Sequence, residues 1–194
     1  YNTGALTVTK APLAIYVTGT YNGTTSYTSS NATIRLAGLS SADSVAGAVT
    51  GITINNSNVA SANYVSTITG VSGFTLSNYE INTGTNNTLS SSNPVVGATK
   101  LLSTNLVSLS TASLSVTANA ATKVYGQTST FGSGATTFTS SGLKGSDVID
   151  SVTLTDTNSG GLATASAGGS YVLTPSLATG TSFSASNYNI TYNT

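Results

Sequence analysis

The sequence contains no histidine, cysteine, methionine or tryptophan, and only ten of its 194 residues carry a formal charge. Without histidine or cysteine it can build neither a Ser-His-Asp or Cys-His nucleophile system nor a zinc site of the usual kind. Its five acidic residues are scattered, which leaves little for general acid–base catalysis. Its five basic residues are too few to attract nucleic acid or an anionic membrane. We therefore expect no enzyme and no cofactor, but a structural or binding module.

Long hydrophobic runs are also missing. The longest, residues 11–17, contains Pro12 and is far shorter than the roughly 18 residues of a membrane span, so we expect no membrane insertion. Serine, threonine and asparagine make up 86 of the 194 residues, a polar composition that often accompanies disorder. Disordered chains are usually highly charged, however, and here the apolar residues stand at strand spacing. We expect a folded piece of a longer protein, because the chain starts at Tyr1 rather than at methionine.

Short segments in which apolar and polar residues alternate recur along the chain. This period of two places the apolar side chains on one face of a β-strand. Turn-forming sequences such as Asn22-Gly23 separate the segments, and helix-favouring residues are scarce, with one Glu, one Gln, four Lys and one Arg. The pattern predicts an all-β fold of the sandwich type or a related one. The clearest strand segments are residues 6–9, 13–17, 114–117 and 188–193.

An internal repeat divides the sequence into two halves. In each half a Tyr-x-Gly or Tyr-Gly turn is followed, 17 positions after its tyrosine, by a Gly-Leu pair. An aspartate then follows the glycine of that pair by five positions. The residues are Tyr21, Gly23, Gly38 and Asp43 in the first half, and Tyr125, Gly126, Gly142 and Asp147 in the second. Identical spacing of this kind is unlikely to arise by chance.

Two further matches follow the same order. Asn78 within Ser77-Asn78-Tyr79 corresponds to Asn187 within Ser186-Asn187-Tyr188, and Leu6-Thr7-Val8-Thr9 is matched with Leu114-Ser115-Val116-Thr117. We therefore expect two tandem domains that superpose, residues 1–112 and residues 113–194. Residues 83–107 have no counterpart in the second half.

The repeated motifs resemble a known family. Tyr21-Asn22-Gly23-Thr24-Thr25 is similar to the signature of YDG repeat domains, with Asn in place of Asp. The segment Lys123-Val124-Tyr125-Gly126-Gln127 is similar to the opening of MBG repeat domains, and residues 186–192 to their closing strand. The resemblance implies two immunoglobulin-like β-sandwiches that serve as a spacer in the stalk of extracellular bacterial surface proteins, including filamentous-haemagglutinin-like adhesins. It implies no catalytic residues.

The two ends of the chain suggest how copies could join. The sequence ends Tyr192-Asn193-Thr194 and begins Tyr1-Asn2-Thr3, so the last strand of one unit would run into the first strand of another. We expect Leu6 and Val8 to lie in a strand. We expect residues 114–116 to close the first domain, and residues 4–9 of a following copy to close the second. The partners are then neighbouring repeats, or copies of the chain in a self-assembling filament joined by strand exchange.

Aspartates and tyrosines carry the remaining hypotheses. We expect Asp43 and Asp147 to form Asx-type turns with nearby backbone N–H groups. Asp147, Asp150 and Asp156 are the only local carboxylate cluster, and calcium binding there is the alternative. The ten tyrosines fit best as packing residues of thin sandwich cores. An exposed Tyr/Asn patch that binds a host or surface glycan or protein is a further alternative.

Overall fold

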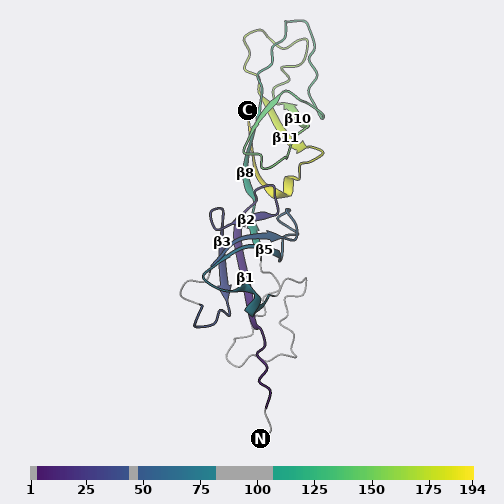
Figure 1. Ribbon diagram of the computed structural model, residues 1–194. Helices are drawn as coiled ribbons and strands as arrows, with labels where there is room; N and C mark the ends of the chain where they lie inside the picture. The colour runs from purple at the N-terminus through teal and green to yellow at the C-terminus, as the bar shows by residue number, and fades with distance from the viewer. Residues whose placement is uncertain (1–3, 44–47, 82–106) are drawn as a thin grey trace. The chain divides into compact units, whose positions relative to one another are not determined.

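A computed structural model describes residues 4–43, 48–81 and 107–194 of the chain (Figure 1). These residues form two compact units: unit 1 comprises Tyr1–Thr20 and Thr24–Ser110, and unit 2 comprises Tyr21–Gly23 and Thr111–Thr194. The described parts contain β-strands and two 3₁₀ turns, and no α-helix, so the predicted all-β class is confirmed. Within these same stretches no helix has the length and apolar character of a membrane span. Of the unmatched stretch 83–107, all but Val107 lies outside the described residues.

Unit 1 contains two sheets. The strands are β1 (Ala11–Thr20), β2 (Ser26–Thr28), β3 (Ala32–Ala37), β4 (Ala48–Ile54), β5 (Val65–Ser72), β6 (Tyr79–Ile81) and β7 (Val107–Ser110), with the 3₁₀ turn η1 (Leu76–Asn78) before β6. One sheet has the order β3-β1-β6, with β7 also paired to β1, and the other has the order β2-β4-β5. Both sheets contribute side chains to one buried cluster, so the core of the unit lies between them.

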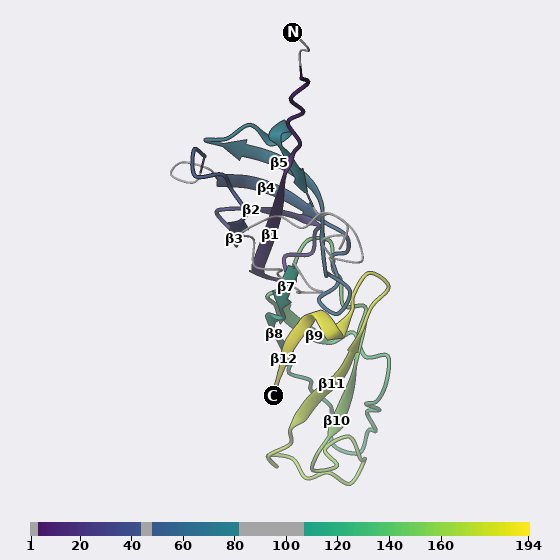
Figure 2. The same ribbon diagram turned by 90° about the horizontal axis from the view of Figure 1, so that it is seen from below.

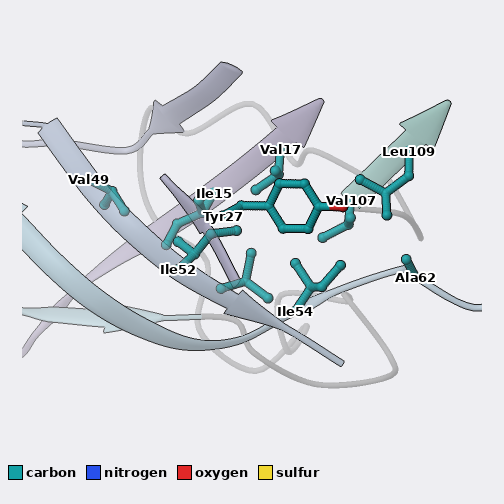
Figure 3. Close-up of a cluster of buried hydrophobic side chains, with 10 residues drawn as sticks. Ile15, Val17, Tyr27, Val49, Ile52, Ile54, Ala62, Val107 and Leu109 are labelled. Carbon is teal, nitrogen blue, oxygen red and sulfur yellow. The ribbon is translucent and has the colours of Figure 1, made fainter. Parts of the chain in front are cut away.

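The alternation in β1 explains how this core forms. Leu13, Ile15 and Val17 are at most 1% exposed, while the residues between them are less buried. Tyr27 of β2 spans the cluster, and Figure 3 shows Val107 of β7 at the hydroxyl end of its ring. Val107 and Leu109 are thus part of the core of unit 1. Burying such apolar side chains is the main force that stabilises a small β-unit.

The last strand of unit 1 runs parallel to the first, in two pieces. Ala11 of β1 pairs with Tyr79 of β6, and further along β1 Val17 pairs with Val107 of β7. We predicted residues 114–116 as the strand that closes the first domain. The structure corrects this: residues 107–110 close unit 1, because their apolar residues enter its core.

Unit 2 repeats the arrangement with fewer strands. Its elements are β8 (Ala112–Ala118), β9 (Phe138–Ser141), β10 (Ser151–Asp156), β11 (Leu173–Thr179), the 3₁₀ turn η2 (Ala185–Asn187) and β12 (Tyr188–Asn193). One sheet has the order β12-β8-β9, and β10 pairs with β11 in a second (Figure 2). Leu114, Val116 and Tyr188 of the first sheet are buried, as are Val152 and Leu154 of the second.

The strand register fixes which residues of the two units correspond. Ala11 pairs with Tyr79 in unit 1, and Ala112 pairs in the same parallel manner with Tyr188 in unit 2. Leu13 of β1 therefore corresponds to Leu114 of β8. The match of residues 6–9 with residues 114–117 is wrong, because it is out of register with this pairing.

Residues 4–10 lie outside any strand and are exposed. Both views show this segment leaving β1 as a free trace (Figures 1 and 2). The expectation that Leu6 and Val8 lie in a strand is therefore wrong for the single chain.

Candidate functional site

Each unit contains a long-range contact between one of its tyrosines and one of its aspartates. In unit 1 the hydroxyl of Tyr79 donates a hydrogen bond of 2.5 Å to Oδ2 of Asp43. The backbone N–H of Ser40 donates in turn to the Tyr79 oxygen, at 3.0 Å. The phenol is thus both donor and acceptor, and it ties the start of β6 to the connection that follows β3. We call this arrangement the tyrosine–aspartate contact.

Unit 2 has the same contact with its own residues. Tyr188 donates to Oδ2 of Asp147 at 2.7 Å, and the backbone N–H of Lys144 donates to the Tyr188 oxygen at 2.9 Å. In both units the aspartate N–H also bonds the carbonyl three residues earlier, at Ser40 and at Lys144. Asp43 and Asp147 therefore occupy equivalent connections.

A 3₁₀ turn and an aromatic neighbour position each tyrosine. The turns η1 and η2 end directly before Tyr79 and Tyr188, which begin β6 and β12. Phe74 packs edge-on against Tyr79, with ring centroids 5.5 Å apart. Phe183 stacks on Tyr188 at 5.3 Å. Such ring pairs add to the burial energy and hold the phenol in place.

The repeated glycines bring the aspartate connection close to the first strand. Gly38 has φ +99°, and a Cβ there would collide with the carbonyl oxygen of Pro12. Gly142 has φ +108°, and a Cβ there would collide with the carbonyl oxygen of Ser113. Both positions require glycine for two reasons: other residues rarely adopt a positive φ, and their Cβ would collide with the first strand of the unit. The identical spacing from Gly38 to Asp43 and from Gly142 to Asp147 reflects this shared geometry.

Tyr21 and Tyr125, by contrast, have different surroundings. Tyr21 is 4% exposed, donates to Oδ2 of Asp147 at 2.8 Å and packs edge-on against Tyr188 at 5.3 Å. Tyr125 is 67% exposed. Gly23 and Gly126 both have positive φ, but a Cβ on Gly23 would meet the backbone of Gly145, whereas Gly126 has open space around it. The first-half motif therefore completes the contact in unit 2, which the spacing did not reveal.

Asn78 and Asn187 share a backbone position but not an environment. Each is the last residue of its 3₁₀ turn, and its backbone N–H donates a hydrogen bond to the carbonyl oxygen three positions earlier. Asn78 is exposed, while Asn187 is 1% exposed.

The contact raises the pKa of both phenols. The hydrogen bond to Asp43 is the main cause that raises the pKa of Tyr79, with burial second. Burial is the main cause that raises the pKa of Tyr188, followed by the hydrogen bond to Asp147. Both causes disfavour the phenolate, so each hydroxyl remains a hydrogen-bond donor further into the alkaline range than a free tyrosine does.

Unit 2 carries a family signature. Residues 114–194 match the family model of the MBG domain, YGX type. The resemblance to MBG repeats is therefore confirmed over these residues, which include β8 to β12. Searches of the curated proteins and of the solved structures found no match.

In the MBG-type unit Asp147, Asp150 and Asp156 each accept hydrogen bonds from different groups. Asp150 accepts from the backbone and hydroxyl of Thr181. Asp156 accepts from the backbone N–H groups of Gly160 and Gly161. Across residues 4–43, 48–81 and 107–194, no three acidic side chains gather as metal ligands. Calcium binding at this cluster therefore has no support from the geometry.

The MBG-type unit also contains a cavity of about 640 Å³. Aromatic side chains of Tyr125, Phe131 and Tyr171 line it, together with residues 118–121 and Thr194. The hydroxyl of Tyr171 donates a hydrogen bond to the carbonyl oxygen of Ser166. We call this space the unit 2 cavity. Its size lies within the range of about 300–1,000 Å³ common for binding sites.

Proposed function

We propose that this chain is a structural spacer segment in the stalk of an extracellular bacterial surface protein, without catalytic activity. The match of residues 114–194 to the MBG domain supports this role, because such repeats resemble stalk modules of bacterial adhesins. The proposal includes two tandem immunoglobulin-like sandwiches. The pairs of sheets in unit 1 and unit 2 are compatible with that architecture.

The observation that carries the proposal is the parallel pairing of first and last strands. In unit 2, Ala112 to Thr117 of β8 pair in parallel with Tyr188 to Asn193 of β12. A force that pulls at both ends of the unit therefore draws the two strands past each other. All the hydrogen bonds between them are then loaded together, because the force acts along the strands while the ladder bonds run between them.

Unit 1 has the same geometry, since β1 is parallel to both β6 and β7. A stalk segment must transmit tension without unfolding, and loading in shear makes both units resistant to it. The tyrosine–aspartate contact adds a fixed point where β6 and β12 begin.

Force spectroscopy on the full chain tests this role. The sequence has no cysteine, so a pair of introduced cysteines gives unique attachment points. Handles at Thr111→Cys and Thr194→Cys pull β8 and β12 in shear. Handles at Asn119→Cys and Thr194→Cys pull the same two strands apart from one end. We expect a clearly higher unfolding force for the first pair, with a gain of roughly 280 Å as the released residues extend. Equal forces for the two pairs would contradict a load-bearing role.

A spacer should also have no ligand of its own. We expect the purified chain to show no saturable binding on a glycan array. Saturable binding that Tyr125→Ala removes would contradict the spacer and favour a glycan-binding module at the unit 2 cavity. Tyr125 is suited to this control because it is exposed and lines the cavity.

A further inference from the structure

Strand β7 has no counterpart among the strands of unit 2. In unit 1, Val17 of β1 pairs with Val107, and Thr20 pairs with Ser110. By the register that relates the units, residues 17–20 correspond to residues 118–121. In unit 2, β8 ends at Ala118, and the described chain provides no strand beside residues 119–121.

The unit 2 cavity lies at that same position. Residues 118–121 line it, and so does Thr194, which follows β12. Phe131 lines it as well, and stands six residues after Tyr125 just as the core residue Tyr27 stands six residues after Tyr21. The place that the apolar face of β7 fills in unit 1 is therefore an aromatic-lined cavity in unit 2.

One segment of the chain has the pattern that this place requires. Leu6-Thr7-Val8-Thr9 alternates like Val107-Ser108-Leu109-Ser110. Leu6 stands five residues before Ala11 of β1, as Val107 stands five residues before Ala112 of β8. Leu6 and Val8 are 91% and 86% exposed, whereas Val107 and Leu109 are 2% and 8% exposed. Large apolar side chains exposed side by side commonly mark an interaction surface.

We propose that residues 6–9 of a second copy of this chain add to unit 2 as a parallel strand beside residues 118–121. Leu6 then lies opposite Ala118, from which Thr194, the next residue in the register of β12 with β8, must turn away. Val8 lies opposite Ala120, and both side chains enter the unit 2 cavity. The joint rests on the proposed function, since it links copies of a repeat segment end to end. Main-chain hydrogen bonds give the affinity, and the alternating side chains set the register.

Side-chain volumes at the joint are complementary. In unit 1 the paired residues are Val17 with Val107, and Gly19 with Leu109. The proposed pairs are Ala118 with Leu6, and Ala120 with Val8. In each case one partner is exchanged for a larger side chain and the other for a smaller one. Packed sites tolerate exchanges of this kind best, because the total volume is nearly conserved.

A register-specific disulfide trap tests the joint. In unit 1 the hydroxyl oxygens of Thr20 and Ser110 lie 3.1 Å apart on the outer face of the paired strands. The equivalent pair at the joint is Ala121 with Thr9. Chains carrying Thr9→Cys are mixed with isotope-labelled chains carrying Ala121→Cys, oxidised, and the mixed dimers are counted by mass spectrometry. Strands pair about 4.8 Å apart, which suits a disulfide.

Two controls decide the result. Thr7→Cys replaces Thr9→Cys as a partner on the same face but two residues out of register. Leu6→Ser with Val8→Ser removes the apolar anchors from an exposed segment, while Thr7→Ser keeps them. We expect the in-register cysteine pair to give about tenfold or more mixed dimer than the out-of-register pair. We expect chains that keep Leu6 and Val8 to exceed chains that lack them by a similar factor in dimer yield.

Equal yields for the two cysteine positions, or yields unchanged by the loss of Leu6 and Val8, would overturn the joint. So would glycan binding at the cavity without register-specific dimers. A failed trap together with high shear resistance would reject the joint and leave the spacer role intact. The two proposals are therefore tested separately.

Discussion

The hydroxyl of Tyr188 donates a hydrogen bond of 2.7 Å to the carboxylate of Asp147, across 41 positions of sequence. The bond joins the first residue of the last strand to the connection after β9. Unit 1 makes the equivalent bond between Tyr79 and Asp43, across 36 positions. In each unit it holds the start of the strand that is parallel to the first strand, where we propose that tension is carried.

Replacing Tyr188 by phenylalanine should destabilise unit 2. The variant removes one donor from Asp147 and leaves the backbone N–H of Lys144 without its acceptor. Hydrogen bonds to charged groups contribute about 1.5–3 kcal/mol, so we expect a loss of that size in the free energy of unfolding. Hydrogen–deuterium exchange over peptides of unit 2 measures it. Tyr125→Phe, at an exposed position, is the matched control and should change stability by less than about 0.5 kcal/mol.

Replacing Gly142 by alanine should cost more than replacing Gly126 or Gly132, two glycines of unit 2 that have open space around them. The new Cβ would have both a positive φ and a collision with the carbonyl of Ser113, for a loss of about 1–3 kcal/mol. Gly126→Ala has a positive φ but open space, and Gly132→Ala has open space without a positive φ. In urea unfolding, the loss in the free energy of unfolding should be largest for Gly142→Ala, smaller for Gly126→Ala and smallest for Gly132→Ala. A loss at Gly142 no greater than at Gly126 would show that the approach to Ser113 is not required.

The tyrosine–aspartate contacts should make the protein sensitive to alkaline pH. The pKa values of Tyr79 and Tyr188 are raised in the folded chain, whereas tyrosines of the unfolded chain ionise near pH 10. Below about pH 10 both states hold these protons, and this contribution to stability is constant. Above about pH 10 the unfolded state loses them first, so the free energy of unfolding falls as the pH rises.

Urea midpoints measured between about pH 8 and pH 11.5 show this fall. The double variant Tyr79→Phe/Tyr188→Phe should lose most of the pH dependence in that window, although it is less stable at neutral pH. A slope identical to that of the unchanged chain would assign the alkaline transition to other groups.

Strand β7 should be required for the stability of unit 1. Leu109 is 8% exposed within the core, and Leu109→Ala should cost about 2–5 kcal/mol. Val8 holds the corresponding place in the exposed segment, so Val8→Ala should change the stability of the dilute chain by less than about 0.5 kcal/mol. Thermal unfolding at low protein concentration compares the two. A substantial loss from Val8→Ala in dilute solution would mean that this segment is already packed within its own chain.

Much of the architecture followed from local sequence patterns. The alternation in β1 and β8 predicted buried Leu13 and Leu114, since strand side chains point to opposite faces in turn. The equal spacing of Gly38 and Gly142 from their aspartates reflected a shared turn, because positive φ is a local requirement for glycine. The family resemblance of the second half was likewise present in short motifs.

Only the tertiary structure decided which distant residues meet. It paired Asp43 with Tyr79 and Asp147 with Tyr188, although the sequence indicated only local turns for both aspartates. It buried Tyr21 and exposed Tyr125, which the repeat had treated as equivalent. It also placed residues 107–110, not residues 114–116, as the closing strand of unit 1. Sequence patterns determine which face of a strand is apolar, but the choice of partner depends on register and burial across the whole unit, which no local pattern contains.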